Sequence, residues 1–213
     1  MTLNMSGTPR DNRPTAMILA FVAAAALLFT VVSKRWLTMG AGDVGFGLTH
    51  FSACFNGTCD SKSNGEIIAE LDRRAADAAS SLAALRSEGS LGVQMAERSG
   101  LRAPEGGKSG FVPLGWITLL STALGALALA GAAGLFASKK KVNLPVSLPG
   151  LALGMLFLSL LAAMIFVARK PGGREFGVGY TFWIFGVANV LGIVAAQILG
   201  KRPAEPLPDD LPL

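Results

Sequence analysis

Four long apolar segments without a charged side chain constrain this sequence more than any other feature. Each is close to the roughly 20 residues that a helix needs to cross about 30 Å of hydrocarbon. In a bilayer the backbone must satisfy its own hydrogen bonds, so such segments form helices rather than strands. Half of the chain is apolar (51%) and only 15% is charged, which places the protein in the membrane class. The sequence predicts an all-α membrane fold with spans at 16–33, 112–137, 148–168 and 176–199.

Basic residues beside these spans predict their orientation. Three lysines, 139–141, lie in the short connection 138–147, and short basic connections stay in the cytoplasm. Because successive spans alternate, the N-terminal segment 1–15 and the tail 200–213 are expected on the same side. The tail is rich in proline and acidic residues and is expected to be disordered. We expect a multi-pass protein of the plasma membrane or the bacterial inner membrane, with cytoplasmic termini and extracytoplasmic loops at 34–111 and 169–175.

The first apolar segment has an alternative interpretation as a cleaved signal peptide. Its apolar core is long for such a peptide. Ser33, Lys34 and Arg35 follow it where a small-residue cleavage site is needed. We therefore expect an uncleaved helix.

The first outer loop contains a strong hairpin signal. An Asn-Gly pair at 56–57 is the preferred two-residue turn, because both positions require positive φ. With the turn there, Phe55 faces Thr58 and Cys54 faces Cys59. Cysteines at a non-hydrogen-bonded pair have Cα atoms about 4.5 Å apart, within disulfide range. The sequence predicts a structural disulfide between Cys54 and Cys59 and therefore an oxidising compartment.

The second half of that loop, about 63–98, is predicted to be helical. Ser63 and Glu66 have capping-box spacing, and Glu70 with Arg74 forms a favourable i,i+4 pair. An apolar seam at heptad spacing follows the cap. Two interpretations stay open: the helix lies on the outer sheet or on top of the bundle, or it binds a partner. The seam residues are Ile68, Leu71, Ala75, Ala78, Leu82 and Leu85, of which Ile68, Leu71, Ala78 and Leu82 are the candidate contact residues.

Aromatic residues near the outer ends of the spans are expected at the lipid headgroups, where amphipathic rings settle. They are Trp36, Phe111, Trp116, Tyr180 and Trp183.

Within the spans no ionisable side chain marks an ion path or proton relay. Asn189 is the most central polar residue, and we interpret it as a helix–helix hydrogen-bonding group rather than a transport residue. Small residues at four-residue spacing favour close helix packing. These are Gly150 with Gly154, and Ala188 with Gly192 and Ala196.

The sequence contains no motif for catalysis or cofactor binding. His50 has no second imidazole or acidic cluster near it, so we expect a strand residue rather than a metal ligand. Phosphate loops, paired redox cysteines and nucleophile elbows are not found. We expect no catalytic, cofactor or metal site and no nucleic-acid partner.

The residues of the first outer loop resemble a known signature. Trp36, then Gly47 and Leu48, then Cys54 and Cys59 are similar to the W…GL…C…C pattern of the claudin and peripheral-myelin-protein superfamily. Thr49 stands where claudins usually carry an aromatic residue, the cysteines are closer together, and the predicted loop helix is an addition.

A second stretch agrees with this resemblance. Arg174, Glu175, Phe176 and Gly177, followed by Tyr180 and Trp183, are similar to the start of the fourth span in claudins. The resemblance implies a left-handed four-helix bundle capped by a small antiparallel sheet, with the disulfide joining neighbouring strands.

From these features we expect a non-enzymatic tetraspan protein that acts through contacts with lipid and with itself or other membrane proteins. An accessory subunit of a larger membrane complex is the first alternative. A membrane thiol oxidoreductase is the second, since disulfide-forming enzymes and vitamin K epoxide reductases also combine four spans with outer cysteines. Such enzymes usually relay electrons through a second cysteine pair, and this chain has two cysteines in all.

Overall fold

The computed structural model describes residues 12–40, 44–87, 110–138, 147–171 and 176–201. Four of its helices are long and apolar enough to cross a membrane, as the sequence predicted. Large apolar side chains on their outer faces stay exposed, among them Ile18, Leu161 and Val187, which is the pattern of helices that face lipid. The four helices are α1 (Arg13–Val32), α4 (Phe111–Ala137), α5 (Leu148–Ala168) and α6 (Tyr180–Gly200).

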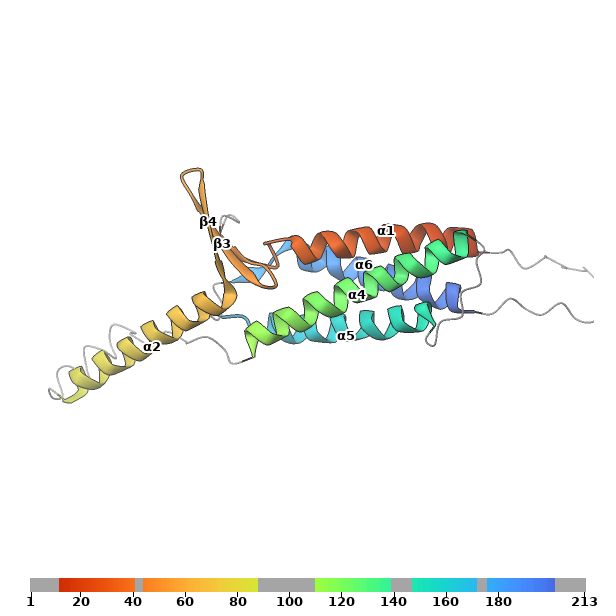
Figure 1. Ribbon diagram of the computed structural model, residues 1–213. Coiled ribbons are helices and arrows are strands. Elements are labelled where there is room, and N and C mark those ends of the chain that lie inside the picture. The colour runs from red at the N-terminus through yellow and green to blue at the C-terminus, as the bar shows by residue number, and fades with distance from the viewer. Residues whose placement is uncertain (1–11, 41–43, 88–109, 139–146, 172–175, 202–213) are drawn as a thin grey trace, which may run out of the picture.

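The four helices lie side by side (Figure 1), and the residues buried between them are mostly small. In α1 the buried positions Ala16, Ala20, Ala23 and Leu27 repeat every three or four residues and form one stripe. In lipid such stripes drive association through close van der Waals packing, because the bilayer removes most of the hydrophobic driving force. The α1 helix packs against α4 and α6, and α5 packs against the same two helices.

A five-stranded antiparallel sheet covers one end of the bundle, which we call the sheet end. Its strand order is β4-β3-β2-β1-β5. The last strand comes from the segment before α6, so the segment after α1 and the segment before α6 both contribute to one sheet. The strands are β1 (Leu37–Met39), β2 (Val44–Phe46), β3 (His50–Phe55), β4 (Thr58–Ser63) and β5 (Gly177–Val178).

The short strand β5 explains why α6 begins at Tyr180, four residues later than the predicted start of the fourth span. Gly177 pairs with Thr38 of β1, which holds the chain extended. Gly179 then donates its N–H to the Trp36 carbonyl at 2.8 Å. A Cβ at Gly179 would lie 2.1 Å from the Arg35 carbonyl oxygen, so only glycine allows this approach.

The helix α2 (Asn64–Ser87) follows β4 directly and extends away from the bundle (Figure 1). Among the described residues, its start is the part that contacts the sheet and the core, where Ile67 and Ile68 pack against buried residues. The expectation that the helix lies along the sheet or the bundle top is therefore wrong beyond its first turns. Residues 88–98 of the predicted helix lie outside the described residues.

The start of α1 and the end of α6 meet at the end of the bundle opposite the sheet. Arg13 donates to the Lys201 carbonyl at 2.9 Å, and its guanidinium lies 5.4 Å from the ring centroid of Phe136 at the end of α4. This arrangement is what four alternating spans require.

Candidate contact surface at the sheet end

The β3–β4 hairpin has the predicted turn and register. Asn56 and Gly57 have φ angles of 49° and 82°, the left-handed values that a two-residue hairpin needs. Cys54 pairs with Cys59, their Cα atoms lie 4.0 Å apart, and their sulfur atoms are bonded. The side chain of Phe55, beside the turn, is 67% exposed. The hairpin therefore presents an apolar side chain on a covalently closed tip.

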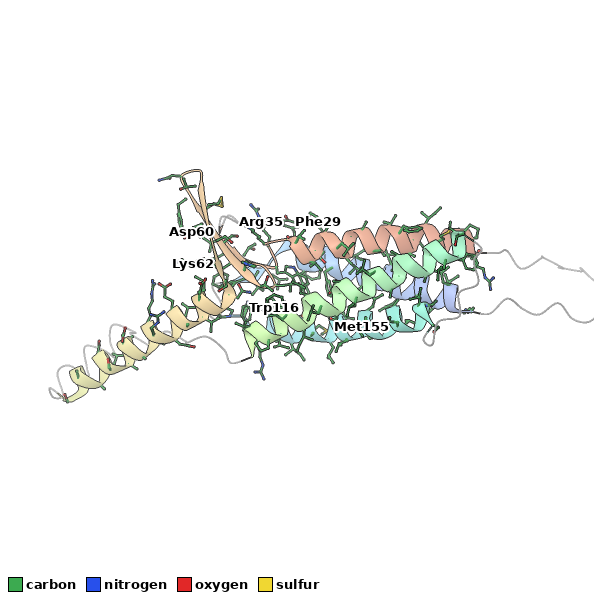
Figure 2. All side chains as sticks on the ribbon, in the orientation of Figure 1. Phe29, Arg35, Asp60, Lys62, Trp116 and Met155 are labelled. Atoms are coloured by element: carbon green, nitrogen blue, oxygen red, sulfur yellow. A yellow bond between two sulfur atoms is a disulfide. The ribbon has the colours of Figure 1, made fainter. Side chains whose placement is uncertain are left out.

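Two N–H groups of the edge strand β4 are occupied by the chain's own carboxylates. Asp60 accepts a hydrogen bond from the Ser61 N–H at 2.8 Å, and Glu66 accepts one from the Ser63 N–H at 3.0 Å. An edge strand with free N–H groups recruits further strands, and side chains that occupy those groups prevent it. Figure 2 shows Asp60 on this hairpin, with Lys62 nearer to α2. Contacts made by the hairpin are therefore expected at side chains rather than by strand addition.

The Ser63–Glu66 capping box is present as predicted and fixes the start of α2. Glu66 N–H donates to Ser63 Oγ at 3.2 Å, while the Glu66 carboxylate accepts from both the N–H and the hydroxyl of Ser63. These bonds from Ser63 to the charged carboxylate lower the pKa of Glu66 below its ordinary value of 4.5. The predicted Glu70–Arg74 ion pair also forms, and Lys62 lies 3.9 Å from Glu70.

The seam of α2 is half-buried along its length. Its described members Ile68, Leu71, Ala75, Ala78 and Leu82 keep part of their surface accessible. The side chain of Leu85 lies outside the described residues. A narrow apolar face on a projecting helix is suited to a protein contact.

The sequence predicted that Trp36 lies at the lipid headgroups. The structure instead places it at the centre of the junction between sheet and bundle. It is fully buried, and its indole N–H donates to the Thr30 carbonyl at 2.7 Å. Its ring lies 4.9 Å from that of Phe185 and 6.3 Å from those of Phe166 and Phe182. Because Trp36 contacts α1, α5 and α6 at once, burial of its large ring stabilises the packing of these three helices below the sheet.

Phe111 is the second exception among the predicted headgroup aromatics. It is fully buried and stacks on Phe166 with ring centroids 4.4 Å apart. Trp116, Tyr180 and Trp183 are half or more exposed, which is the accessibility that a headgroup position requires.

Gly47 and Leu48 form the β2–β3 turn, which is pressed against α4. Gly47 donates its N–H to the His50 carbonyl at 2.7 Å, and Leu48 is buried. A Cβ at Gly115 of α4 would lie 1.9 Å from the Leu48 carbonyl oxygen, so the turn contacts the helix backbone directly. His50 begins β3 as an exposed strand residue, in line with its interpretation.

Asn64 is a structural residue that the sequence did not reveal. It is fully buried, and its Nδ2 donates to the carbonyls of Gly47 and Leu48, both at 3.1 Å. Its backbone N–H donates to the Thr49 carbonyl at 2.9 Å, while its Oδ1 is buried without a hydrogen-bond partner. Asn64 thus joins the start of α2 to the β2–β3 turn. Asparagine is common at helix starts, so nothing local distinguishes it.

Inside the bundle Asn189 makes the predicted helix–helix contact. It is fully buried, and its Nδ2 lies 3.4 Å from Ser159 Oγ of α5. Gly192 is packed against Leu156 and Leu129, as its spacing predicted. The Gly150–Gly154 pair does not serve close packing: both are exposed, and a Cβ at Gly154 would meet no atom within 4 Å.

The signature residues that resemble claudins have different environments. Trp36 and Leu48 are buried, Gly47 occupies the tight turn, and Gly177 is an exposed member of β5. Arg174 and Glu175 lie outside the described residues. Among the described residues, no three His, Cys, Asp or Glu side chains are grouped closely enough to hold a metal ion.

No protein-family model matches the chain, and no curated protein is significantly similar to it.

Proposed function

We propose that this chain is a non-enzymatic, claudin-like tetraspan membrane protein that acts through protein contacts at its sheet end, as an adhesion, scaffold or envelope-organising protein. The support is the combination of a bundle of four membrane-length helices with a small antiparallel sheet to which both outer segments contribute. In this proposal the sheet end is extracytoplasmic and both termini are cytoplasmic. The disulfide suits an oxidising compartment of that kind.

The observation that carries the proposal is the projecting β3–β4 hairpin with Phe55 beside its turn. The disulfide closes the hairpin, and the β4 edge is occupied by Asp60 and Glu66. A rigid tip of this kind loses little conformational entropy on binding, which favours recognition by an exposed aromatic side chain. The apolar face of α2, centred on Leu71, Ala78 and Leu82, supplies a second contact surface.

Site-specific photo-crosslinking in cells tests the proposal. A photoreactive phenylalanine analogue replaces Phe55 in one variant and Ala78 in another. The matched control places it at Leu161, which is 59% exposed on the lipid-facing side of α5. We expect protein crosslinks from Phe55 and Ala78 under conditions where Leu161 yields lipid adducts or none.

The crosslinked products, identified by mass spectrometry after mild-detergent purification, separate the possible roles. Self-crosslinks support an assembling claudin-like protein. Crosslinks to one defined complex favour an accessory subunit with that complex's function. A monomer without crosslinks from either position contradicts the proposal.

Thiol trapping separates the proposal from a thiol oxidoreductase. A structural Cys54–Cys59 disulfide stays fully oxidised in growing cells, because it closes a tight hairpin and has no second cysteine pair to exchange with. A reproducibly reduced fraction that rises and falls with the quinone redox state would favour the enzyme instead.

A further inference from the structure

A cavity of about 490 Å³ lies at the sheet end, between the last turn of α1, the β2–β3 turn, β4 and α4. Its volume is within the range of small-molecule sites. One part of its lining is polar and the other is apolar. We call the polar part of the lining the rim and the apolar part the floor. The rim consists of Ser33, Lys34, Thr49, His50 and Ser61, and the floor includes Val31, Leu119 and the 75% exposed Val32.

The floor belongs to helices of membrane length. Val31 and Val32 end α1, and Leu119 lies about two turns into α4. Trp116, one turn before Leu119, is 50% exposed, the accessibility of an aromatic ring at headgroup depth. In a bilayer crossed by these helices, the cavity would lie at the boundary between the hydrocarbon and the headgroups of one leaflet.

The charge of the cavity is positive. None of its lining residues is acidic, and within the described part of the chain Lys34 forms no ion pair. Two carboxylates lie close to the rim: Asp60 accepts from the Ser61 N–H, and Glu66 accepts from Ser63 and interacts electrostatically with His50. Both keep their negative charge, but neither forms an ion pair with Lys34. An ammonium group with three donors is thus available at the rim.

The Thr49–His50 pair supplies another donor. Thr49 Oγ1 and His50 Nδ1 lie 2.8 Å apart and share one hydrogen bond. If the hydroxyl donates, the neutral ring carries its proton on Nε2. If the ring donates, the hydroxyl proton is free. In either tautomer one donor beside Lys34 remains for a ligand.

We propose that this cavity binds the phosphate of an anionic glycerophospholipid from the leaflet at the sheet end. Lys34 pairs with the phosphate, the Thr49–His50 pair donates to it, and the acyl chains follow Val31, Val32 and Leu119 into the hydrocarbon. A zwitterionic lipid brings its own ammonium group beside Lys34 and binds more weakly. This site does not depend on the proposed contact function.

Native mass spectrometry of the full-length protein in mild detergent tests the site with phosphatidylglycerol as the probe. Lys34→Gln is expected to weaken binding about tenfold, the usual effect of losing a charged hydrogen bond. Ser61→Asp, which adds a carboxylate to the rim, is expected to weaken it at least as much. Lys34→Arg should retain binding. Arg35→Gln is the matched control, because Arg35 is an exposed cation at the same end (Figure 2) that does not line the cavity.

The proposal holds if phosphatidylglycerol binds more tightly than phosphatidylcholine and if only Lys34→Gln and Ser61→Asp lose that preference. Equal losses of phosphatidylglycerol affinity in Lys34→Gln and Arg35→Gln would overturn the proposal, because they would indicate a general attraction of the lipid to the basic surface. Unchanged binding in Lys34→Gln would overturn it as well. Displacement of the lipid by millimolar inorganic phosphate would show a free-phosphate site and refute the assignment to a lipid.

Discussion

Replacing Gly115 by alanine tests how the β2–β3 turn is seated on the bundle. A Cβ built at Gly115 lies 1.9 Å from the Leu48 carbonyl oxygen, whereas real Cβ contacts essentially never fall below 3.0 Å. The obstacle is backbone, and Asn64 Nδ2 holds that same carbonyl at 3.1 Å. To relieve the clash, either α4 must move outward or the turn must lift and weaken its bond to Asn64.

The expected cost follows from these two consequences. Forcing a methyl group into a packed interface costs about 1–3 kcal/mol. Weakening a hydrogen bond to a buried carbonyl adds about 1 kcal/mol or more. Together they give a loss of about 3 kcal/mol in the free energy of unfolding. For a chain of this length that loss lowers the unfolding midpoint by roughly 6–12 °C.

Two glycines in the same helix serve as controls. A Cβ at Gly134 would meet no atom within 4 Å, so Gly134→Ala should leave the midpoint unchanged or raise it. A Cβ at Gly125 would lie 3.1 Å from Leu156 Cδ2, a side-chain atom that can move, so Gly125→Ala should be intermediate. The assay is thermal unfolding of purified protein in mild detergent. If Gly115→Ala and Gly134→Ala unfold at the same temperature, the proposed seating of the turn is refuted.

Three further changes probe the capping box, the buried amide and the bundle interior. Hydrogen bonds from Ser63 lower the pKa of Glu66 in the folded state. The ionised carboxylate therefore stabilises the start of α2 fully above pH 4.5, and this stabilisation is lost as the pH falls through the lowered folded-state pKa. Amide exchange at the start of α2, corrected for intrinsic rates, should therefore rise on acidification in the wild type but not in Glu66→Gln; identical pH profiles would contradict this. Asn64→Asp places carboxylate oxygens against the carbonyl groups of Gly47 and Leu48 and should lower the free energy of unfolding by about 3 kcal/mol or more. The loss is measured as a fall in the unfolding midpoint, and an unchanged midpoint would argue against the two buried hydrogen bonds of Asn64. Asn189→Leu removes two long contacts to Ser159 Oγ, at 3.4 and 3.5 Å, and should cost only about 0.6 kcal/mol in the same assay. A severe loss of stability would mean that Asn189 has a larger role.

Several features were predictable from the sequence because they depend on neighbours along the chain. The four membrane-length helices follow from local hydropathy, and their extents are close to those predicted. The Asn-Gly turn sets the register that brings Cys54 to Cys59, and the Ser63–Glu66 spacing sets the start of α2. In each case the interacting groups are separated by only a few residues, so the pattern contains the geometry.

The tertiary structure decided the features that join distant segments. Trp36 and Phe111 are aromatic residues near the ends of spans, as headgroup aromatics are, yet both are buried. Trp36 packs against rings of α5 and α6, and Phe111 packs against Phe166 of α5 and Phe46 of β2. The pairing of Gly177 with Thr38 turned the predicted start of the fourth span into a strand.

The same distinction applies to the residues of the sheet end. Asn64 and Gly115 acquire their roles only because the β2–β3 turn is brought against both of them. The sequence by itself determined the membrane-length helices, the closed hairpin and the cap of α2. Which residues support the sheet on the bundle was decided by tertiary packing, because a residue's type does not specify which distant backbone will lie against it.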